Sequence, residues 1–196
     1  MSVCLNALMS RVRNAVTRLR GDERGLAATE FAMIVPLMLV MFFGTVEFSS
    51  GVAVDRKVTL VARTLSDLTS QSLSVTDTDL TNFFASSSLI FWPYASTPIN
   101  ATVTQLYINP TTLKATVQWS RKSDGSTGRA NGSQVTIPAN LAVAGTYLIY
   151  SEVSYVYVPA VGYVMAKAGV TLSDVNYTRP RQSTCVLYGT TSCTTV

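Results

Sequence analysis

The chain has 196 residues, of which 47% are hydrophobic and 13% are charged, and its formal net charge is +4. This length suits one folded domain with an additional segment, and the low charged fraction is typical of a membrane-attached or assembled protein. The charge is uneven. Residues 1–25 hold five arginines against two acidic residues, whereas the remaining 10 basic and 9 acidic side chains nearly cancel. The sequence therefore predicts no nucleic-acid partner, because such a protein needs a basic surface on its folded domain.

The sequence contains no histidine. Histidine is the commonest general base and metal ligand in proteins, so catalytic arrangements of the serine–histidine or cysteine–histidine kind are excluded. The best remaining pair, Ser126 with Lys122, lies in a glycine-rich loop and is interpreted as solvated surface. We therefore predict that the protein is not an enzyme and that it uses no cofactor and no metal.

Residues 1–25 are predicted to form a basic cytoplasmic leader. A basic helix face that ends at Gly21 is formed by Arg11, Arg13, Arg18 and Arg20. Positive charge beside a membrane segment stays on the cytoplasmic side of the membrane. The leader therefore places the N-terminus in the cytoplasm and the rest of the chain in the periplasm.

An apolar run follows the leader. Over residues 26–54 only Glu30 and Glu47 carry a charge. A helix needs about 20 residues to cross the hydrocarbon core of a bilayer. We therefore predict a single transmembrane helix over residues 26–48, with Glu30 near its cytoplasmic end and Glu47 at the outer interface.

Pro36 lies inside this run and has no backbone N–H to donate. We predict a kink there, which membrane helices tolerate. The run also admits another interpretation, a secretory signal cleaved after Ala53. Its length and the presence of Glu30 argue against this, because the apolar region of a signal spans only about 7–15 residues.

The helix is predicted to continue beyond the membrane, over residues 49–73. Spacings of three and four residues separate the apolar side chains Val54, Val58, Val61, Leu65 and Leu68. This spacing indicates one apolar stripe on a helix that a domain covers on one side. We expect one helix from about Leu26 to about Ser70.

Residues 74–196 are predicted to form a periplasmic α+β domain. A short helix over 77–85 would have Thr76 as its N-cap and Asp79 completing a capping box, an interpretation preferred over a calcium loop. Alternating or β-branched and aromatic residues predict strands over 101–108, 113–120, 147–158 and 170–178. The predicted fold is therefore a long helix packed on an antiparallel sheet.

Two aromatic residues in a loop and two C-terminal cysteines are expected to stabilise this domain. Phe91 and Trp92 are expected to pin the loop before the first long strand to the core. Cys185 and Cys193 are close in sequence and lie in a domain placed outside the cytoplasm, which favours a disulfide over two free thiols.

The start of the apolar run carries a recognisable pattern. Gly25 follows an arginine and stands five residues before Glu30, which Phe31 follows. This arrangement resembles the cleavage site of type IV prepilins, in which a prepilin peptidase cuts after the glycine, here between Gly25 and Leu26. The wider stretch GLAATEFAMIVP resembles the TadE/TadF minor pilins, or pseudopilins, of the Tad (Flp) pilus system.

The resemblance implies a type IV pilin-like fold and a role in Tad pilus assembly. Its expected partners are the prepilin peptidase, other pilins, Tad assembly proteins and membrane lipid. It also implies that Glu30 docks on a neighbouring subunit by neutralising the amine that the cut creates on Leu26.

The alternatives left open are a Glu30 that only lies at headgroup level, and an uncleaved, membrane-anchored binding or adhesion domain. A carboxylate inside hydrocarbon is costly unless it is paired, which favours docking.

Overall fold

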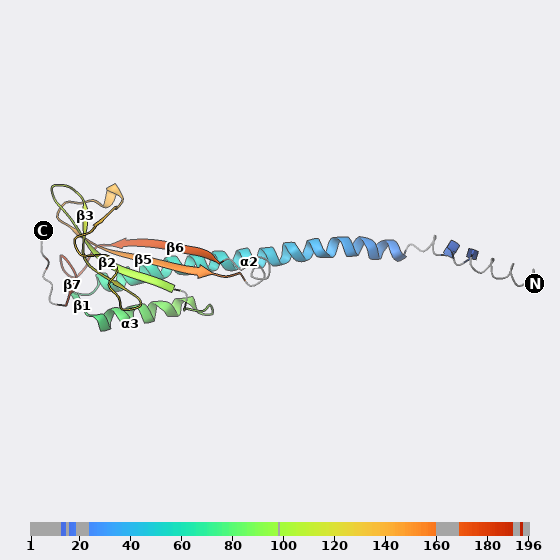
Figure 1. Cartoon of the computed structure of the whole chain (residues 1–196), viewed down its shortest axis with the longest axis horizontal. Coiled ribbons are helices and arrows are strands. Elements are labelled where there is room, and N and C mark those ends of the chain that lie inside the picture. The colour runs from blue at the N-terminus through green and yellow to red at the C-terminus, as the bar shows by residue number, and fades with distance from the viewer. Residues whose placement is uncertain are drawn as a thin grey trace, which may run out of the picture. The chain divides into compact units, whose positions relative to one another are not determined.

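The computed structural model describes residues 13–14, 16–18, 24–97, 99–159, 169–189 and 193. Contacts divide the chain into two compact units, residues 1–46 and 47–196. The first unit contains the start of the long helix α2 (Arg24–Ser70), and the second, which we call the domain, contains its end and all the strands (Figure 1). Most of the predicted leader lies outside the described residues.

Helix α2 confirms the prediction of one helix from about Leu26 to about Ser70. It has 47 residues and continues through Pro36, so the missing N–H of the proline does not end the helix. The kink expected at Pro36 stays a prediction.

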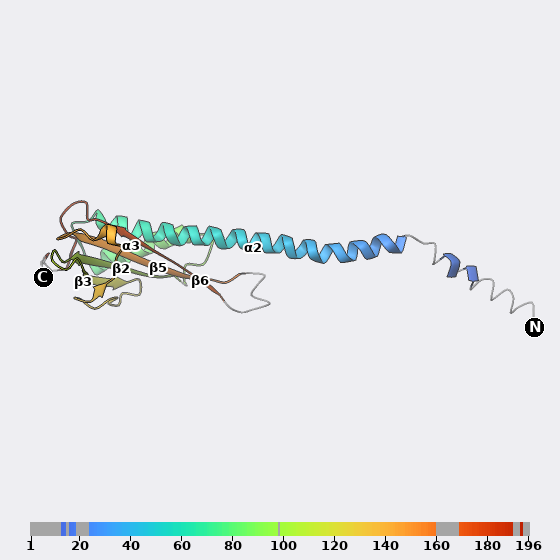
Figure 2. The ribbon, with the colours of Figure 1, turned by 90° about the horizontal axis from the view of Figure 1, so that it is seen from above.

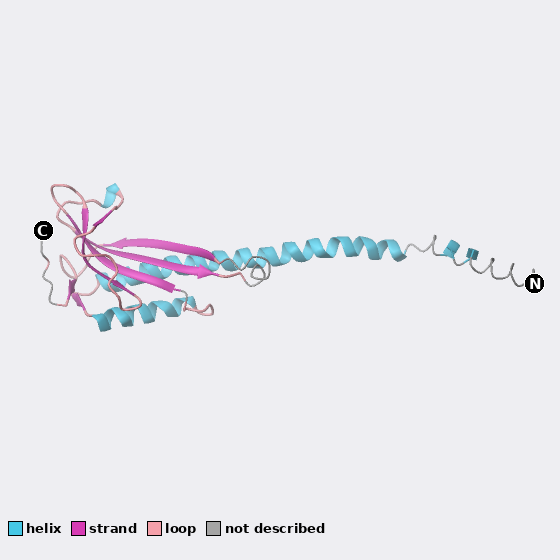
Figure 3. Cartoon of the chain, in the orientation of Figure 1, coloured by secondary structure: helices cyan, strands magenta, loops and turns pink. Residues whose placement is uncertain are grey.

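The domain is an α+β structure, as predicted (Figure 3). Its helical elements after α2 are α3 (Asp77–Ser88), η1 (Leu89–Phe91) and η2 (Ala139–Leu141). Its long strands are β2 (Ile99–Ile108), β3 (Ala115–Lys122), β5 (Tyr147–Tyr157) and β6 (Val170–Thr178). Three strands have only two residues each: β1 (Ser74–Val75), β4 (Gln134–Val135) and β7 (Leu187–Tyr188).

Five strands form one antiparallel, curled sheet in the order β4-β3-β2-β5-β6. The four predicted strands are its four long members, and the predicted hairpin is the β2–β3 pair. An irregularity between Gln105 and Leu106 shifts the register of that pair. The two-residue strands escaped prediction because so short a segment has no periodicity. Two of them, β1 and β7, form a separate parallel pair.

One face of the sheet packs against α2, which runs along it in Figure 2. The predicted stripe is confirmed at Val54, Val58, Val61 and Leu65, which are at most 1% exposed. Leu68 is only half-buried, so the stripe closes one turn earlier than expected. The sheet supplies the opposite wall of this core with Ala101, Val103, Trp119, Ile149, Val153 and Tyr155.

Helix α3 joins α2 in covering this face. Thr76 caps it by accepting a hydrogen bond from the backbone N–H of Asp79, whose carboxylate bonds back to the N–H of Thr76, so the predicted capping box is confirmed. The helix runs three residues further than predicted, to Ser88. Phe91 is fully buried as expected, but Trp92 is 80% exposed, so the expectation that it pins the loop was wrong.

The other face of the sheet carries a second, smaller core. It consists of Leu106, Ile108, Ala115, Val117, Leu148 and Tyr150, against which Val135, Ile137 and Leu141 pack. Beside it Arg129 forms a two-bonded ion pair with Glu152, which also accepts a hydrogen bond from the hydroxyl of Tyr150. The tyrosines of β5 therefore serve mainly in packing, as their pattern predicted.

The C-terminal segment is held by buried polar contacts. The backbone N–H of Val186 donates to the side-chain carbonyl of Gln105 at 2.7 Å, and its carbonyl accepts from Nε1 of Trp119 at 3.0 Å. Cys185, which is 1% exposed, forms a disulfide with Cys193 in the structure. The two hydrogen bonds of Val186 tie this segment to β2 and β3.

Candidate processing and docking site on the N-terminal helix

The first turn of α2 presents Gly25 and Leu26 without covering them. Both are exposed, Leu26 by 62%, and a Cβ atom added to Gly25 would have no neighbour within 4 Å. Phe31 is also exposed. Steric crowding therefore does not explain the glycine at position 25. The peptide bond between Gly25 and Leu26 is accessible at the surface.

Glu30 lies one helical turn after Leu26 and shares its helix face, because residues four apart are neighbours on an α-helix. Thr29 bonds back to the carbonyl of Leu26 at 2.8 Å, which uses its hydroxyl within the helix. Glu30 is exposed, and no hydrogen bond or ion pair joins it to another described residue. Its carboxylate is available for a positive group.

The rest of α2 in the first unit has an apolar surface on all sides. The following side chains are between 42% and 81% exposed: Met33, Ile34, Leu37, Met38, Leu39, Val40, Met41, Phe42 and Phe43. Glu30 is the single charged residue over 25–46. A helix that is hydrophobic all round is covered by lipid or by other helices. By length and composition, α2 is the one described helix able to cross a membrane.

The second half of α2, within the domain, is fastened by small polar side chains. Ser151 on β5 donates to the carbonyl of Ala62 at 2.6 Å. Asn176 and Thr178 on β6 donate to Oγ of Ser66, at 2.6 and 3.1 Å. Because Ala62 and Ser66 are small and fully buried, the helix lies close to the two strands. This network fixes how the helix sits on the sheet.

Glu47, the first residue of the domain, also has a partner on the sheet. It accepts a hydrogen bond from the hydroxyl of Tyr157 at 3.1 Å. A Cβ atom on Gly51, one turn further along α2, would lie 3.7 Å from the ring of Tyr157. Glu47 is therefore fastened within its own domain, unlike Glu30. The sequence could not show this pairing, because the two residues are 110 positions apart.

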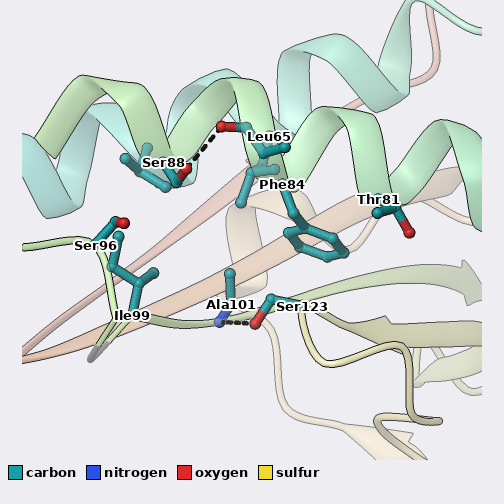
Figure 4. Close-up of a pocket in the computed structure, with 10 residues that line it drawn as sticks. Leu65, Thr81, Phe84, Ser88, Ser96, Ile99, Ala101 and Ser123 are labelled. Atoms are coloured by element: carbon teal, nitrogen blue, oxygen red, sulfur yellow. Dashed lines mark hydrogen bonds between the residues drawn. The ribbon is translucent and has the colours of Figure 1, made fainter.

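A pocket of about 310 Å³ lies between α2, α3 and the start of β2 (Figure 4). Leu65, Phe84 and Ile99 give it apolar walls, and Ser96 and Ser123 add hydroxyl groups. None of its lining residues is charged, so it holds no general base. The described residues also contain no group of three or more acidic, cysteine or histidine side chains able to hold a metal.

The structure therefore places the predicted site residues in two regions. Gly25, Leu26, Glu30 and Phe31 share the first two turns of α2, and Pro36 follows on the same helix. The cysteine pair lies near the end of the domain and takes no part in this site. Sequence reasoning missed Tyr157 as the partner of Glu47.

These features define the class of protein: a long apolar N-terminal helix whose end packs on a five-stranded antiparallel sheet, the architecture of pilins. Residues 25–65 match the family described as TadE-like protein, so the chain is TadE-like over this helix. That family implies a protein related to the Tad pilus. No curated protein and no solved structure matches the chain.

Proposed function

We propose that the protein is a minor pilin, or pseudopilin, of the Tad (Flp) pilus system and that a prepilin peptidase cleaves it between Gly25 and Leu26. The observation that carries the proposal is that two features meet at Gly25. The TadE-like match begins at Gly25, where α2 emerges exposed and unobstructed. The catalytic groups belong to the peptidase, and the chain performs no reaction of its own.

Cleavage gives the carboxylate of Glu30 its partner. The cut leaves a free amine on Leu26, positively charged at neutral pH, and the Glu30 of one subunit neutralises this amine on its neighbour. A carboxylate in hydrocarbon costs several kcal/mol unless it is paired, so pairing favours lateral contact between helices. The exposed apolar surface of α2 then packs against other pilin helices instead of lipid.

The proposed location follows from the same helix. Before assembly the protein is a single-pass inner-membrane protein with a cytoplasmic leader and a periplasmic domain. Its partners are the peptidase, other pilins, Tad assembly proteins and membrane lipid. The domain primes, caps or decorates the pilus, or stays in the assembly machine.

Cleavage is tested with Gly25→Val in a strain that has the peptidase, using intact-mass analysis of the membrane protein. The wild-type chain should begin at Leu26, and the variant should keep its leader. Gly44→Val is the matched control, because Gly44 lies on the same helix and a Cβ atom there also meets nothing within 4 Å. A wild-type chain that retains residues 1–25 contradicts the proposal and leaves an uncleaved, anchored binding domain. A chain that begins at Val54 identifies a secretory signal.

Docking is tested separately with Glu30→Gln. The variant should be cut normally, but its co-purification with other pilins should fall at least about tenfold, as expected when one partner of a buried charge pair is removed. Glu47→Gln, which changes the other carboxylate of α2, should keep wild-type co-purification. Equal co-purification of all three proteins shows that Glu30 lies only at headgroup level.

A further inference from the structure

One end of the domain gathers exposed apolar side chains around the Tyr157–Glu47 hydrogen bond. We call these residues the rim: Phe48 (76% exposed), Val52 (39%), Val156 (39%), Val158 (46%) and Val170 (54%). They come from α2, from the end of β5 and the residue that follows it, and from the start of β6. Single exposed apolar residues are ordinary on a protein surface, but a group of them marks an interaction site.

Tyr157 links the three elements that carry the rim residues. Tyr157 lies between Val156 and Val158 in sequence and pairs with Val170 across the β5–β6 ladder. Its hydroxyl reaches Glu47, the residue before Phe48, and its ring lies against Gly51, the residue before Val52. Because successive side chains of a strand point to opposite faces, Val156 and Val158 lie on the face of the sheet away from Tyr157. The rim therefore runs around this end of the sheet from one face to the other, beside the first turns of α2 in the domain.

Gly169 keeps the strands of the rim close. A Cβ atom there would lie 2.5 Å from a methyl group of Val156 and 3.4 Å from one of Val158. Real Cβ atoms do not approach as closely as the first distance, so a side chain at this position would displace Val156. Glycine thus allows both valines to pack beside the start of β6.

The rim is almost free of charge. Over the described residues 47–54, 156–159 and 169–173, the one charged side chain is Glu47, and it already accepts the hydrogen bond of Tyr157. The next charge along α2 is Asp55, eight residues or about 12 Å beyond Glu47. The next on β6 is Asp174, about 13 Å beyond Val170.

We propose that the rim is a membrane-contact surface that rests on the lipid of the outer leaflet while the protein is anchored. This inference rests on the proposed function, because it requires α2 to span the bilayer. Lipid is the favoured occupant because the apolar run of α2 ends at Val46 and the rim begins two residues later. Tyrosine with its apolar ring and polar hydroxyl is typical of the membrane–water interface, which suits Tyr157.

The contact has a consequence for assembly. While the rim rests on lipid, it limits how deep the helix can sit and how the domain can tilt. A subunit that leaves the membrane for a pilus must give up this contact together with the lipid around α2. The rim then becomes available to a neighbouring subunit.

The test is site-directed spin labelling of the full chain in phospholipid nanodiscs, in a Cys4→Ser background. Nitroxides are placed at Val158→Cys in the rim and at Val143→Cys, which is 41% exposed in the loop after η2. Each label is probed with oxygen, which concentrates in lipid, and with a water-soluble nickel complex. We expect the ratio of oxygen to nickel accessibility to be at least about threefold higher at position 158 than at position 143.

A third label at Val40→Cys separates the two proposals. Val40 lies in the apolar half of α2 and is 70% exposed. Suppose that the label at position 40 has the high oxygen-to-nickel ratio of lipid and that positions 158 and 143 have the same low ratio. The rim inference is then overturned, but the membrane-spanning role of α2 is supported. If Val40 also reports water, the membrane-spanning role itself fails.

A label at Val170→Cys guards against a variant that distorts the hairpin. It should agree with the label at position 158, because Val170 pairs with Tyr157, the residue before Val158, and reports on the same end of the sheet from β6. A low oxygen-to-nickel ratio at both position 158 and position 170 overturns the proposal. Labels that become dry only after co-assembly with other pilins also overturn it and identify a protein as the occupant.

Discussion

The two halves of α2 have the same backbone structure but opposite surroundings. Before residue 47, every large apolar side chain from Leu37 to Phe43 is exposed. After residue 47, Val54, Val58 and Leu65 are buried against the sheet. The second half finds its partner within the chain. The first half has no cover among the described residues, so its apolar surface points to lipid or to other subunits.

The polar groups of the two halves differ in the same way. Ser66 in the second half is fully buried and receives hydrogen bonds from two side chains of β6. Glu30 in the first half is exposed and bonds to no other described residue. One half uses polar groups to fix its place in a fold, whereas the one carboxylate of the other half has no partner among the described residues.

The largest expected difference between the two halves is in the effect of a leucine-to-alanine substitution on the free energy of unfolding. Leu65→Ala should lower the free energy of unfolding of the domain by about 2–5 kcal/mol, because Leu65 is 1% exposed and its loss leaves a cavity. Leu39→Ala should change it by less than about 0.5 kcal/mol, because Leu39 is 48% exposed and lies outside the domain. Urea titration in detergent, followed by near-ultraviolet circular dichroism, measures both. Equal losses would show that the two halves unfold as one unit.

The disulfide tests how far the domain depends on its own C-terminal segment. Cys193→Ser in a Cys4→Ser background should lower the free energy of unfolding by roughly 2–3 kcal/mol, because the bond closes a loop between residues only 8 apart. Reduction of the wild-type disulfide should have the same effect on the thermal midpoint. A midpoint that neither change moves would mean that the two cysteines are not paired in the mature protein.

The serine network of the second half gives a smaller effect. Ser66→Ala should cost about 1–3 kcal/mol, because Asn176 and Thr178 lose a buried acceptor. Ser49→Ala is the control, since Ser49 is exposed on the same helix and should lie within about 0.5 kcal/mol of wild type. A Ser66→Ala domain as stable as the control would show that water replaces the lost hydroxyl.

The smallest expected effect is that of Tyr150→Phe on the pH dependence of unfolding. The free energy of unfolding of this variant should fall less steeply at alkaline pH than that of the wild type. Burial first, and then the hydrogen bond to Glu152, raise the pKa of Tyr150 above its ordinary value of 10.0. The folded state therefore holds this proton more tightly than the unfolded chain does, so stability is complete below about pH 10 and falls as the pH rises further. Tyr150→Phe should reduce the steepness of that fall in urea titrations between pH 9 and pH 12. An unchanged slope would assign the alkaline loss to the other buried tyrosines.

Much of the architecture could be predicted from local pattern. The stripe at Val54, Val58 and Leu65 predicted the core face of α2, and Thr76 with Asp79 predicted the start of α3. The exposed Trp92 shows where this reasoning fails. An aromatic residue in a loop has no periodicity to show which way it points, and the backbone carbonyl of Trp92 accepts a bond from Lys57 while its ring faces solvent.

The candidate site divides along the same line. Gly25, Leu26 and Glu30 lie within six consecutive residues, so the sequence alone determined the processing pattern, the apolar run and the position of Glu30 near its start. Only the tertiary structure decided that Glu47 accepts a hydrogen bond from Tyr157 and that Ser66 accepts one from Asn176 on β6. It also decided that valines at the end of β5 and the start of β6 lie beside α2 in the rim. The physical reason is distance along the chain. Helix periodicity and cleavage motifs are local, whereas contacts more than 100 residues apart depend on how the sheet folds back onto the helix.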